Sequence, residues 1–517
     1  MTVQPTSHRS GEAADRIVCT NPADGTVIDE ISVPDEDQIR NGVAEAREAQ
    51  THWRRLPVEE RAEYLLDARD ILLDHRRELR DLLVAETGKA QTDALAEFLA
   101  VFETFDYYTK KAPEVLGDDS PSLRLLKNKS VTVRRVPYGV AVNISPWNFP
   151  FDLAITPLIP ALVAGNAAII KPSEWTPLIA ERTVELMNQA GLPDGLLQAI
   201  PGYGDTGAQL IDRADVVSFT GSVETGRSVA EAAARKLIPC SLEMGGKDPC
   251  IVLDDADPQR AINAATFGAF FNSGQVCMSV ERVYVHENLY DDFVDSVVTD
   301  TRRLRQGNPA TGQVDVGSMT FPPQVEVIEA QLQDAVDKGA RILTGGSAIS
   351  IDGGTYFEPT VVVDVTHEMD LMTEETFGPV MPIMKVASAA EAVRLANDSP
   401  YGLNASIFST DRERARRLAR QIESGNVCIN DVIASYLAIE APYGGMKESG
   451  VGRRKGLWEL EHYTQPQTIM EDRLGMKREP FWYPYREPVV DTLDRALDGL
   501  YRRGIAAKIK GLFSGSN

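Results

Sequence analysis

The chain has 517 residues, is 43% hydrophobic, and carries a formal net charge of −23 from 76 acidic and 53 basic residues. This length predicts two or three domains with large buried cores. The acidic balance excludes a nucleic-acid-binding surface, which needs basic residues against phosphate. The acidic composition is typical of a salt-rich cytoplasm, but a GC-rich genome or ordinary solubility explains it equally.

Targeting signals and cysteine usage indicate the cellular setting. No apolar run is long enough to cross a membrane, and Met1 to Thr6 lacks the basic-then-apolar order of a signal peptide. The cysteines are odd in number and show no paired spacing, which predicts neither a disulfide framework nor a metal site. They are Cys19, Cys240, Cys250, Cys277 and Cys428. We expect a reducing, cytoplasmic protein.

The first third of the chain changes from a helical to an alternating pattern. Apolar residues recur at three- and four-residue spacing over Glu36 to Trp53, Val58 to Glu86 and Thr92 to Tyr108, which predicts helices. Residues 124–145 alternate in hydrophobicity and predict paired strands.

From residue 140 onward, short apolar strands and helical segments alternate, which predicts an α/β fold with a doubly wound parallel sheet. The predicted strands are Val140–Ile144, Ala167–Ile170, Gln198–Ile200, Val216–Phe219 and Cys250–Val252. Residues 260–430 repeat this pattern. Their predicted elements are a helix over Pro258–Ser273, strands near Arg282–His286 and Met381–Val386, and a helix over Ala389–Asn397.

The end of the chain, from 476 to 517, predicts an aromatic and amphipathic tail. An aromatic segment with prolines at 479–485 precedes apolar residues at helical spacing between Val489 and Ile509. The stretch from Tyr501 to Phe513 is basic and amphipathic, which favours either packing on a partner subunit or a weak contact with a membrane surface.

Two motifs carry the chemistry. Cys277 follows a Gly-Gln pair, and Glu243 precedes a Gly-Gly pair, while none of the six histidines falls in either motif. A thiol that works without an imidazole suits attack on a carbonyl, followed by release through an activated water.

These motifs belong to an ordered set that resembles the aldehyde dehydrogenase superfamily over roughly residues 15 to 470. The set, in chain order, is 146–150 (PWNFP), 171–174 (KPSE), 219–226 (FTGSVETG), 242–247 (LEMGGK), 270–277 (FFNSGQVC), 375–379 (ETFGP) and 442–447 (PYGGMK). The long tail is similar to a branch that includes proteins called succinate-semialdehyde dehydrogenases.

The resemblance implies a domain organisation and a homodimer or homotetramer. It places a Rossmann-like NAD-binding domain at 1–123 and 146–246, and a catalytic α/β domain at 247–440. It places a small β oligomerisation arm and the end of the fold at 124–145 and 441–475.

The resemblance implies three catalytic roles: Cys277 as nucleophile, Asn148 as oxyanion donor beside the Cys277 N–H, and Glu243 as base for the hydrolytic water. The structural alternatives are an inert buried cysteine, an asparagine that shapes a turn, and a surface glutamate. Relatives that transfer the acyl group to coenzyme A lack this glutamate, so hydrolysis is favoured. The joint presence of all three residues disfavours a non-catalytic member of the fold.

The resemblance also implies a nicotinamide cofactor, with NAD favoured over NADP. Glu174 would accept a ribose hydroxyl and repel a 2′-phosphate, although Lys171 and Glu174 are alternatively a surface salt pair. The implied cofactor-binding residues are Trp147, Lys171, Ser173, Glu174, Gly221, Ser222, Gly226, Glu375 and Phe377.

The implied substrate residues favour a neutral, partly apolar aldehyde. Succinate-semialdehyde enzymes hold the distal carboxylate with arginines where this chain has Thr156 and Phe271. Asp152 would repel a carboxylate, or attract an amino-aldehyde, while Phe149 and Tyr443 add apolar lining. Succinate semialdehyde is the alternative substrate.

One departure from the family pattern lies after Gly452-Arg453. Many members carry a glutamate there, whereas this chain has Arg454-Lys455. A proton relay through that position is therefore not expected to operate in the family's usual way.

Overall fold

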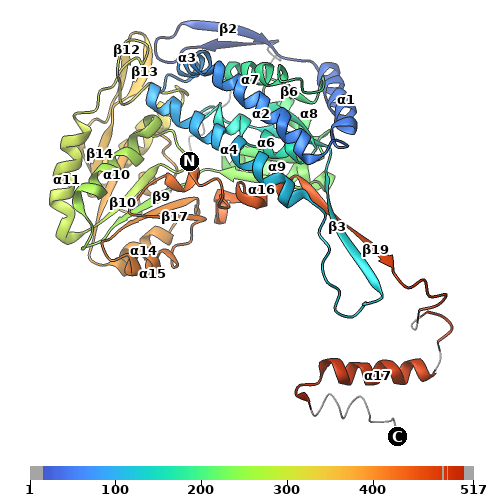
Figure 1. Cartoon of the computed structure of the whole chain (residues 1–517). Helices are drawn as coiled ribbons and strands as arrows, with labels where there is room; N and C mark the ends of the chain where they lie inside the picture. Colours follow the sequence, from blue (N-terminus) through green and yellow to red (C-terminus); the bar gives the residue numbers. More distant parts are fainter. Residues whose placement is uncertain (1–14, 480–481, 486, 506–517) are drawn as a thin grey trace. The chain divides into compact units, whose positions relative to one another are not determined.

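The structure is a computed structural model that describes residues 15–479, 482–485 and 487–505 (Figure 1). It divides into two units: Met1–Gly117 with Arg135–Pro466, and Asp118–Arg134 with Gln467–Asn517. None of the helices in the described ranges is long and apolar enough to cross a lipid bilayer.

The first unit contains a six-stranded sheet of order β18-β8-β7-β4-β5-β6. Neighbouring strands are parallel except β18, which is antiparallel to β8 at one edge. The strands are β4 (Val140–Ile144), β5 (Ala167–Lys171), β6 (Leu197–Ala199), β7 (Val216–Gly221), β8 (Cys240–Met244) and β18 (Gly450–Val451). Parallel strands end at one edge of a sheet, so the segments after β4, β5, β7 and β8 emerge together.

Amphipathic helices pack around this sheet and bury one continuous apolar core against it. In α1, for example, Ile39, Val43, Ala46 and Trp53 are buried, and Asp35 caps the first turn. The helices are α1 (Glu36–Trp53), α2 (Val58–Asp74), α3 (Arg76–Thr87), α4 (Gln91–Leu116), α5 (Asp152–Ile155), α6 (Leu158–Val163), α7 (Leu178–Asn188), α8 (Gly204–Ile211), α9 (Val223–Lys236) and α16 (Gly456–His462).

A second, seven-stranded sheet of order β11-β14-β15-β10-β9-β16-β17 is parallel except for the β11–β14 pair. Its strands are β9 (Asp248–Val252), β10 (Val280–His286), β11 (Arg341–Thr344), β14 (Thr360–Val363), β15 (Val380–Val386), β16 (Asn404–Phe408) and β17 (Asn426–Ile429). Its helices are α10 (Pro258–Phe270), α11 (Glu287–Thr301), α12 (Gln324–Asp337), α13 (Asp370–Thr373), α14 (Ala389–Asn397) and α15 (Arg412–Ala419). Figure 1 shows α10, α11, α14 and α15 around this sheet.

Short elements complete the first unit. Two hairpins are formed by β1 (Arg16–Thr20) with β2 (Val27–Ser32), and by β12 (Ala348–Ile351) with β13 (Gly354–Phe357). The 3₁₀ turns are η1 (Phe271–Gly274), η2 (Ala434–Leu437) and η3 (Lys447–Ser449).

The second unit is a two-stranded ribbon followed by a helix. Strand β3 (Lys129–Pro137) pairs with β19 (Thr464–Asp472), and Lys129 forms ion pairs with Asp472 and Glu479. Helix α17 (Glu487–Tyr501) has no buried residue. Residues 506–513 of the basic stretch lie outside the described residues.

The α/β fold with doubly wound parallel sheets is confirmed, and four local predictions are corrected. The helix expected over Val58 to Glu86 is interrupted at His75, and the helix from Pro258 ends at Phe270, where left-handed residues begin. Residues 124–145 do not pair with each other, because β3 pairs with β19 and β4 joins the first sheet. The strand at Cys250–Val252 belongs to the second sheet.

Candidate active site

Cys277 follows a tight reversal of the chain after α10. Asn272, Ser273 and Gly274 all have positive φ angles, of 50°, 57° and 71°. Side chains disfavour this region, so the surroundings must impose the turn. A side chain at Gly274 would place its Cβ 2.1 Å from the carbonyl oxygen of Gly378, so only glycine fits there.

Hydrogen bonds from distant segments fix this turn. The Asn272 N–H donates to the Asp93 carboxylate at 3.1 Å. The Gln275 side chain accepts the Thr320 N–H at 2.9 Å and donates to the Asn272 carbonyl at 3.1 Å. The backbone that leads into Cys277 is therefore held independently of any substrate.

Asn148, in the segment after β4, is tied to the same turn. Its side-chain amide donates to the Gln275 carbonyl at 2.9 Å. Its own carbonyl accepts from Lys89 Nζ at 2.7 Å and from the Asn272 side chain at 3.1 Å. An amide carries two N–H donors, so Asn148 can hold the turn with one and offer the other to an oxyanion.

A buried ion pair between Lys89 and Glu97 supports the segment that carries Asn148. Both side chains are fully buried, and Glu97 also accepts the N–H groups of Phe151 and Asp152, each at 3.0 Å. The Lys89 amine lies 4.3 Å from the Phe149 ring centroid. We call Lys89, Glu97, Asn148, Asn272 and Gln275 the Lys89 network. It joins α4, the segment after β4 and the Cys277 turn.

The Cys277 thiol lies in an apolar cluster. Burial raises the pKa of this thiol, and the carboxylates of Asp248, Glu375 and Glu243 raise it further. The thiol is therefore neutral in the protein alone and needs a base to become a nucleophile. The cluster consists of Val276, Met278, Leu403 and Tyr443, with Phe149, Phe271, Ile433 and Tyr436 partly buried against it; we call it the Cys277 pocket.

Glu243 lies on β8, as expected, and is buried. Both of its carboxylate oxygens lack a hydrogen-bond partner in the described part of the chain. Burial raises the pKa of Glu243 to about 8, while Arg454 and Arg453 act in the opposite direction. A side chain at Gly444 would place its Cβ 3.0 Å from Glu243 Oε1. The carboxylate therefore has open lone pairs and titrates where a base is useful.

A segment from far along the chain brings cations to Glu243. Gly450 pairs with Glu243 across β18 and β8, and the chain then continues to Arg454. The Arg454 guanidinium contacts Glu459 at 3.1 Å and donates to the Thr156 hydroxyl at 2.9 Å. Thr156 stands where succinate-semialdehyde enzymes are expected to carry an arginine, and Arg454 reaches its hydroxyl from another part of the chain. That a substrate carboxylate meets no matching arginine stays a prediction.

Lys455, the next residue, is the second site residue that the sequence analysis did not identify. Its amine lies 3.1 Å from the Tyr436 ring centroid and 5.2 Å from that of Tyr443, and it donates to the Tyr436 carbonyl. Burial lowers the pKa of Lys455 to about 7, with Asp152 opposing this shift most strongly. The only sequence signal was the basic Arg454-Lys455 pair, whose contacts a single sequence does not give.

The Glu375 carboxylate contacts Gly245 and Gly246, the glycine pair that follows β8. It accepts the Gly246 N–H at 2.9 Å, and a side chain at Gly245 would place its Cβ 2.3 Å from that carboxylate. The neighbouring Phe377 N–H donates to Glu281 at 2.9 Å, and Glu281 in turn pairs with the buried Lys247 at 2.7 Å. Glu375 is thereby fixed near Cys277.

The carboxyl edge of the first sheet offers a site for a dinucleotide. Ser222 follows β7 and caps α9 by accepting the Thr225 N–H at 3.3 Å, so the helix N-terminus faces outward beside Gly221. A side chain at Gly226 would meet Met244 Sδ at 2.2 Å, so glycine permits the close packing of α9. Backbone N–H groups at such a start suit a pyrophosphate.

Side chains of the neighbouring segments suit the two riboses. Lys171 ends β5 with a buried amine 3.5 Å from the Glu174 carboxylate, and burial lowers its pKa. Trp147 lies 5.4 Å from Phe377, ring centroid to ring centroid, and Ser173 is buried. An amine and a carboxylate at adjacent positions can bind a ribose diol, so these residues fit a nicotinamide dinucleotide.

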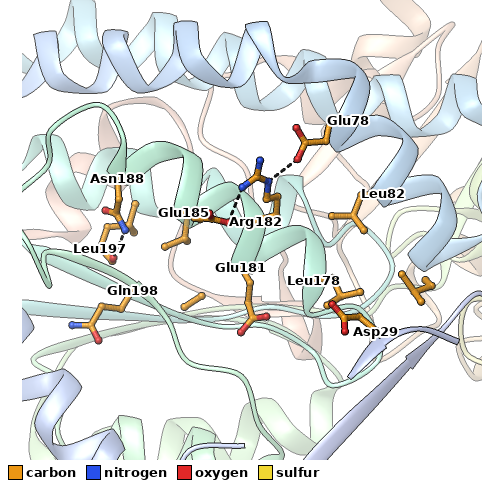
Figure 2. A pocket seen from close by; sticks show the side chains of 13 residues that line it. Asp29, Glu78, Leu82, Leu178, Glu181, Arg182, Glu185, Asn188, Leu197 and Gln198 are labelled. Atoms are coloured by element: carbon orange, nitrogen blue, oxygen red, sulfur yellow. Dashed lines mark hydrogen bonds and ion pairs between the residues drawn. The ribbon is translucent and has the colours of Figure 1, made fainter. Parts of the chain in front are cut away.

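A cavity of about 730 Å³ lies elsewhere, between β2, α3, α7 and β6 (Figure 2). Figure 2 shows Arg182 bridging Glu78 and Glu185, with bonds of 2.6 and 2.7 Å. Burial raises the pKa of the nearby Glu181 to about 7. None of the sequence-predicted site residues lines this cavity, so we assign the chemistry to the Cys277 pocket.

Comparisons with known proteins identify the family of the chain. Residues 8–469 match the Aldehyde dehydrogenase family. A 4,4′-diapolycopene aldehyde oxidase from Methylomonas sp. is 42% identical over 94% of this chain and 91% of its own. A Mycobacterium ulcerans protein is 39% identical over 89% of each chain, and its name gives succinate semialdehyde and NADP(+). The structure of betaine aldehyde dehydrogenase from Staphylococcus aureus with NAD+ has a TM-score of 0.86 at 32% identity, covering 89% of this chain and 93% of its own.

Proposed function

The chain belongs to the aldehyde dehydrogenase family of oxidoreductases, and from this premise we propose that it oxidises an aldehyde to the carboxylic acid through a thioester on Cys277. One observation carries the proposal. A partly buried thiol packed against an apolar cluster, a fixed amide at Asn148 and an unpartnered carboxylate at Glu243 lie close together. These groups match the needs of nucleophilic attack, oxyanion stabilisation and hydrolysis.

The first step forms a bond between sulfur and carbon. The Cys277 thiol gives up its proton, and the thiolate adds to the carbonyl carbon. The Asn148 amide and the Cys277 backbone N–H receive the oxyanion, whose negative charge they stabilise. The raised pKa of the thiol means that its proton must pass to a base, either water or a neighbouring carboxylate, before the sulfur attacks.

The second step releases the acid. A nicotinamide cofactor held by the residues at the carboxyl edge of the first sheet would supply the hydride acceptor, and loss of hydride from the substrate carbon would leave the acyl group on Cys277 as a thioester. Glu243 then takes a proton from water, the water oxygen attacks the thioester carbon, and the thiolate departs. The unpartnered oxygens of Glu243 can accept a hydrogen bond from that water.

We propose NAD as the cofactor, with NADP second. The Glu174 carboxylate lies 3.5 Å from the Lys171 amine. A carboxylate at this position accepts a hydrogen bond from a ribose hydroxyl and repels a 2′-phosphate. The S. aureus relative was solved with NAD+, whereas the M. ulcerans relative is named for NADP(+). The test compares kcat/KM for the two cofactors. A higher value for NADP would contradict the proposal.

For the substrate we propose a neutral, partly apolar aldehyde. The Cys277 pocket is built from aliphatic and aromatic side chains. Phe271 extends it, lying 5.9 Å from Phe149 and 5.0 Å from Phe267 between ring centroids. Phe267 is itself 52% exposed, so this row of aromatic rings extends from the cluster to the surface. The Methylomonas relative is named for 4,4′-diapolycopene aldehyde.

Succinate semialdehyde is the second candidate, and Arg454 is the observation that favours it. Its guanidinium donates to the hydroxyl of Thr156. Succinate-semialdehyde enzymes are expected to carry at this position an arginine that binds the substrate carboxylate. However, Glu459 already pairs with Arg454 at 3.1 Å, and Asp152 lies beside Lys455. The positive charge of this wall is therefore largely compensated within the protein.

One assay at matched salt separates these candidates. Hexanal, benzaldehyde and succinate semialdehyde are compared by NADH absorbance, with and without coenzyme A. We expect the neutral aldehydes to have kcat/KM values about ten- to a hundredfold higher, since a missing charge-assisted contact costs about that much. A tenfold advantage for succinate semialdehyde would assign Arg454 or Lys455 to its carboxylate. NADH formation that depends on coenzyme A would show that the acyl group is transferred to coenzyme A rather than hydrolysed.

We also propose that the chain forms a homo-oligomer. The β3–β19 ribbon has only two strands, and such a ribbon needs a further partner for stability. Light scattering at micromolar concentration and high salt tests this. A monomeric mass would contradict it. Binding to anionic vesicles that is lost on truncation after Asp491 would add a membrane contact through the tail.

A further inference from the structure

A row of polar side chains lies on one face of the first sheet, beside Glu243. Asn143 on β4, Ser218 on β7 and Ser241 on β8 are partners in the strand register. Partners in a parallel sheet point to the same face, as do residues two positions apart on one strand. Thr220 and Glu243 follow two residues later on β7 and β8 and are partners in turn, so they share that face. We call Asn143, Ser218, Thr220 and Ser241 the polar row.

Each member of the polar row is buried and has one oxygen without a hydrogen-bond partner in the described part of the chain. Only the amide nitrogen of Asn143 is used among these side-chain groups, since it donates to two carbonyls of α5 at 3.0 Å each. A buried polar atom without a partner costs free energy, so such atoms in proteins are normally paired with protein groups or with ordered water. Several unpartnered oxygens on one face therefore indicate bound waters.

The spacing of the polar row suits bridging water. Neighbouring strands are about 4.8 Å apart, and residues two positions apart on one strand are about 6.6 Å apart. One or two waters, each with hydrogen bonds of about 2.8 Å, span distances of this size. Glu243 is next to Thr220 across the strands and next to Ser241 along β8. Waters on the polar row therefore reach its carboxylate, whose two oxygens are also without a partner among the described residues.

The polar row meets the surface at Gly452. This glycine is exposed, and an ideal Cβ on it would lie 3.2 Å from Ser241 Oγ. The Cβ position of Gly444 lies 3.0 Å from Glu243 Oε1 and 3.2 Å from the Gly452 carbonyl oxygen. Ser241 and Glu243 are thus both neighbours of Gly452, and neither glycine carries a side chain that would separate them from it.

We propose that the polar row is a water site that connects Glu243 to the solvent at Gly452, and that Ser241 is a positioning residue for the water through which Glu243 releases its proton. The inference rests on the proposed hydrolysis at Glu243. In that step Glu243 takes one proton from the attacking water, and the hydroxide that remains bonds to the acyl carbon as the thiolate leaves.

The polar row then restores the base. The Glu243 carboxyl group gives its proton to a bound water, and that water passes one of its own protons on toward the solvent at Gly452. Each water gains one proton and loses one, so nothing but the proton of Glu243 leaves the site. The carboxylate is thereby ready for the next turnover.

The experiment compares Ser241→Val with Ser241→Thr, which have nearly the same shape but differ in a methyl against a hydroxyl group. The rate constant for hydrolysis is the steady-state rate of NADH formation divided by the fraction of enzyme that carries the acyl group, measured by intact-mass spectrometry after acid quench. It is measured in mixtures of H₂O and D₂O. Ser241→Ala serves where the valine variant does not fold. Ser406→Ala is the matched control, because Ser406 is also a buried serine with an unpartnered hydroxyl, but on β16 of the second sheet.

We expect hydrolysis to be about two- to tenfold slower in Ser241→Val than in Ser241→Thr, which is the contribution of one hydrogen bond. The burst of NADH precedes hydrolysis and keeps its rate in both variants, and Ser406→Ala keeps both rates. As the fraction of D₂O rises, the hydrolysis rate should fall along a curve in the parent, because more than one proton moves, and along a straight line in Ser241→Val.

A crystal structure of the parent should also show water bound between Ser241 and Glu243. Equal hydrolysis rates in Ser241→Val and Ser241→Thr, an equal loss in the burst and in hydrolysis, or a crystal structure without water on the polar row overturns the proposal. A parent enzyme that forms no acyl-enzyme would instead overturn the proposed function.

Discussion

Around Cys277 and Asn148 the polar groups are hydrogen-bonded to distant parts of the chain, whereas around Glu243 the carboxylate oxygens have no partner among the described residues. The difference follows from what each group must do. Oxyanion donors work best when they are fixed before the reaction. A base must instead accept a proton and admit a water, which needs open lone pairs.

The region around Cys277 and Asn148, which we call the fixed side, is tested first by removing the nucleophile. We expect Cys277→Ala to lose aldehyde-dependent NADH formation by at least about four orders of magnitude, while the Lys89 network keeps the fold. Steady-state assays and thermal unfolding measure the two effects. Cys240→Ala is the control, since Cys240 is half-buried outside the Cys277 pocket. Activity of Cys277→Ala within about tenfold of the parent would remove the covalent mechanism.

The region around Glu243, which we call the open side, is tested by replacing the base. Glu243→Gln should slow hydrolysis by about two to four orders of magnitude, the usual contribution of a general base. Hydride transfer precedes hydrolysis, so a burst of about one NADH per active site should remain in rapid mixing. Loss of the burst would show that Glu243 also takes the proton from the Cys277 thiol.

Breaking the Lys89–Glu97 ion pair tests how much the fixed side depends on the Lys89 network. Lys89→Met leaves Glu97 buried without its partner, which costs about 3–5 kcal/mol in the free energy of unfolding. The double variant Lys89→Met with Glu97→Gln should recover part of this loss, because no charge is left uncompensated. Denaturant unfolding measures both. A loss below about 1 kcal/mol for the single variant would mean that water reaches Glu97.

The pH dependence of unfolding separates the two sides more finely. The pKa of Glu243 is raised in the folded chain to about 8 from 4.5, so between these values the unfolded state ionises while the folded state keeps the proton. Stability from this group therefore falls as pH rises through that window, by about 1.4 kcal/mol per pH unit. The advantage of Glu243→Gln over the parent should grow between pH 6 and 7. An advantage that stays constant there would show that Glu243 is ionised in the folded state as well.

The sequence alone predicts the elements and motifs whose signals are local. The helix over Ala389–Asn397 and the strand over Val140–Ile144 agree with α14 and β4. Strand β8 was not predicted as a separate strand, although Glu243 was expected at an apolar strand end. The end of α10 at Phe270 depends on the left-handed turn that follows, which packing against Gly378 imposes.

The supporting contacts of the site have no local signal. Lys89 and Asn148 are 59 positions apart, and Arg454 and Thr156 are 298 apart. A single sequence shows a lysine and an arginine at these positions but not what each touches. The Lys89 network and the placement of Lys455 on the rings of Tyr436 and Tyr443 therefore required the structure.

The Lys89 network holds the chain mainly through carbonyl and N–H groups of the main chain, at Asn148, Asn272, Gln275, Phe151 and Asp152. Main-chain groups persist whatever side chain a position carries. The walls of the Cys277 pocket, such as Phe271 and Ile433, are therefore free to vary during evolution without loosening the reacting groups. A mutant library confined to these wall positions should yield enzymes with new aldehyde preferences that retain the same chemistry.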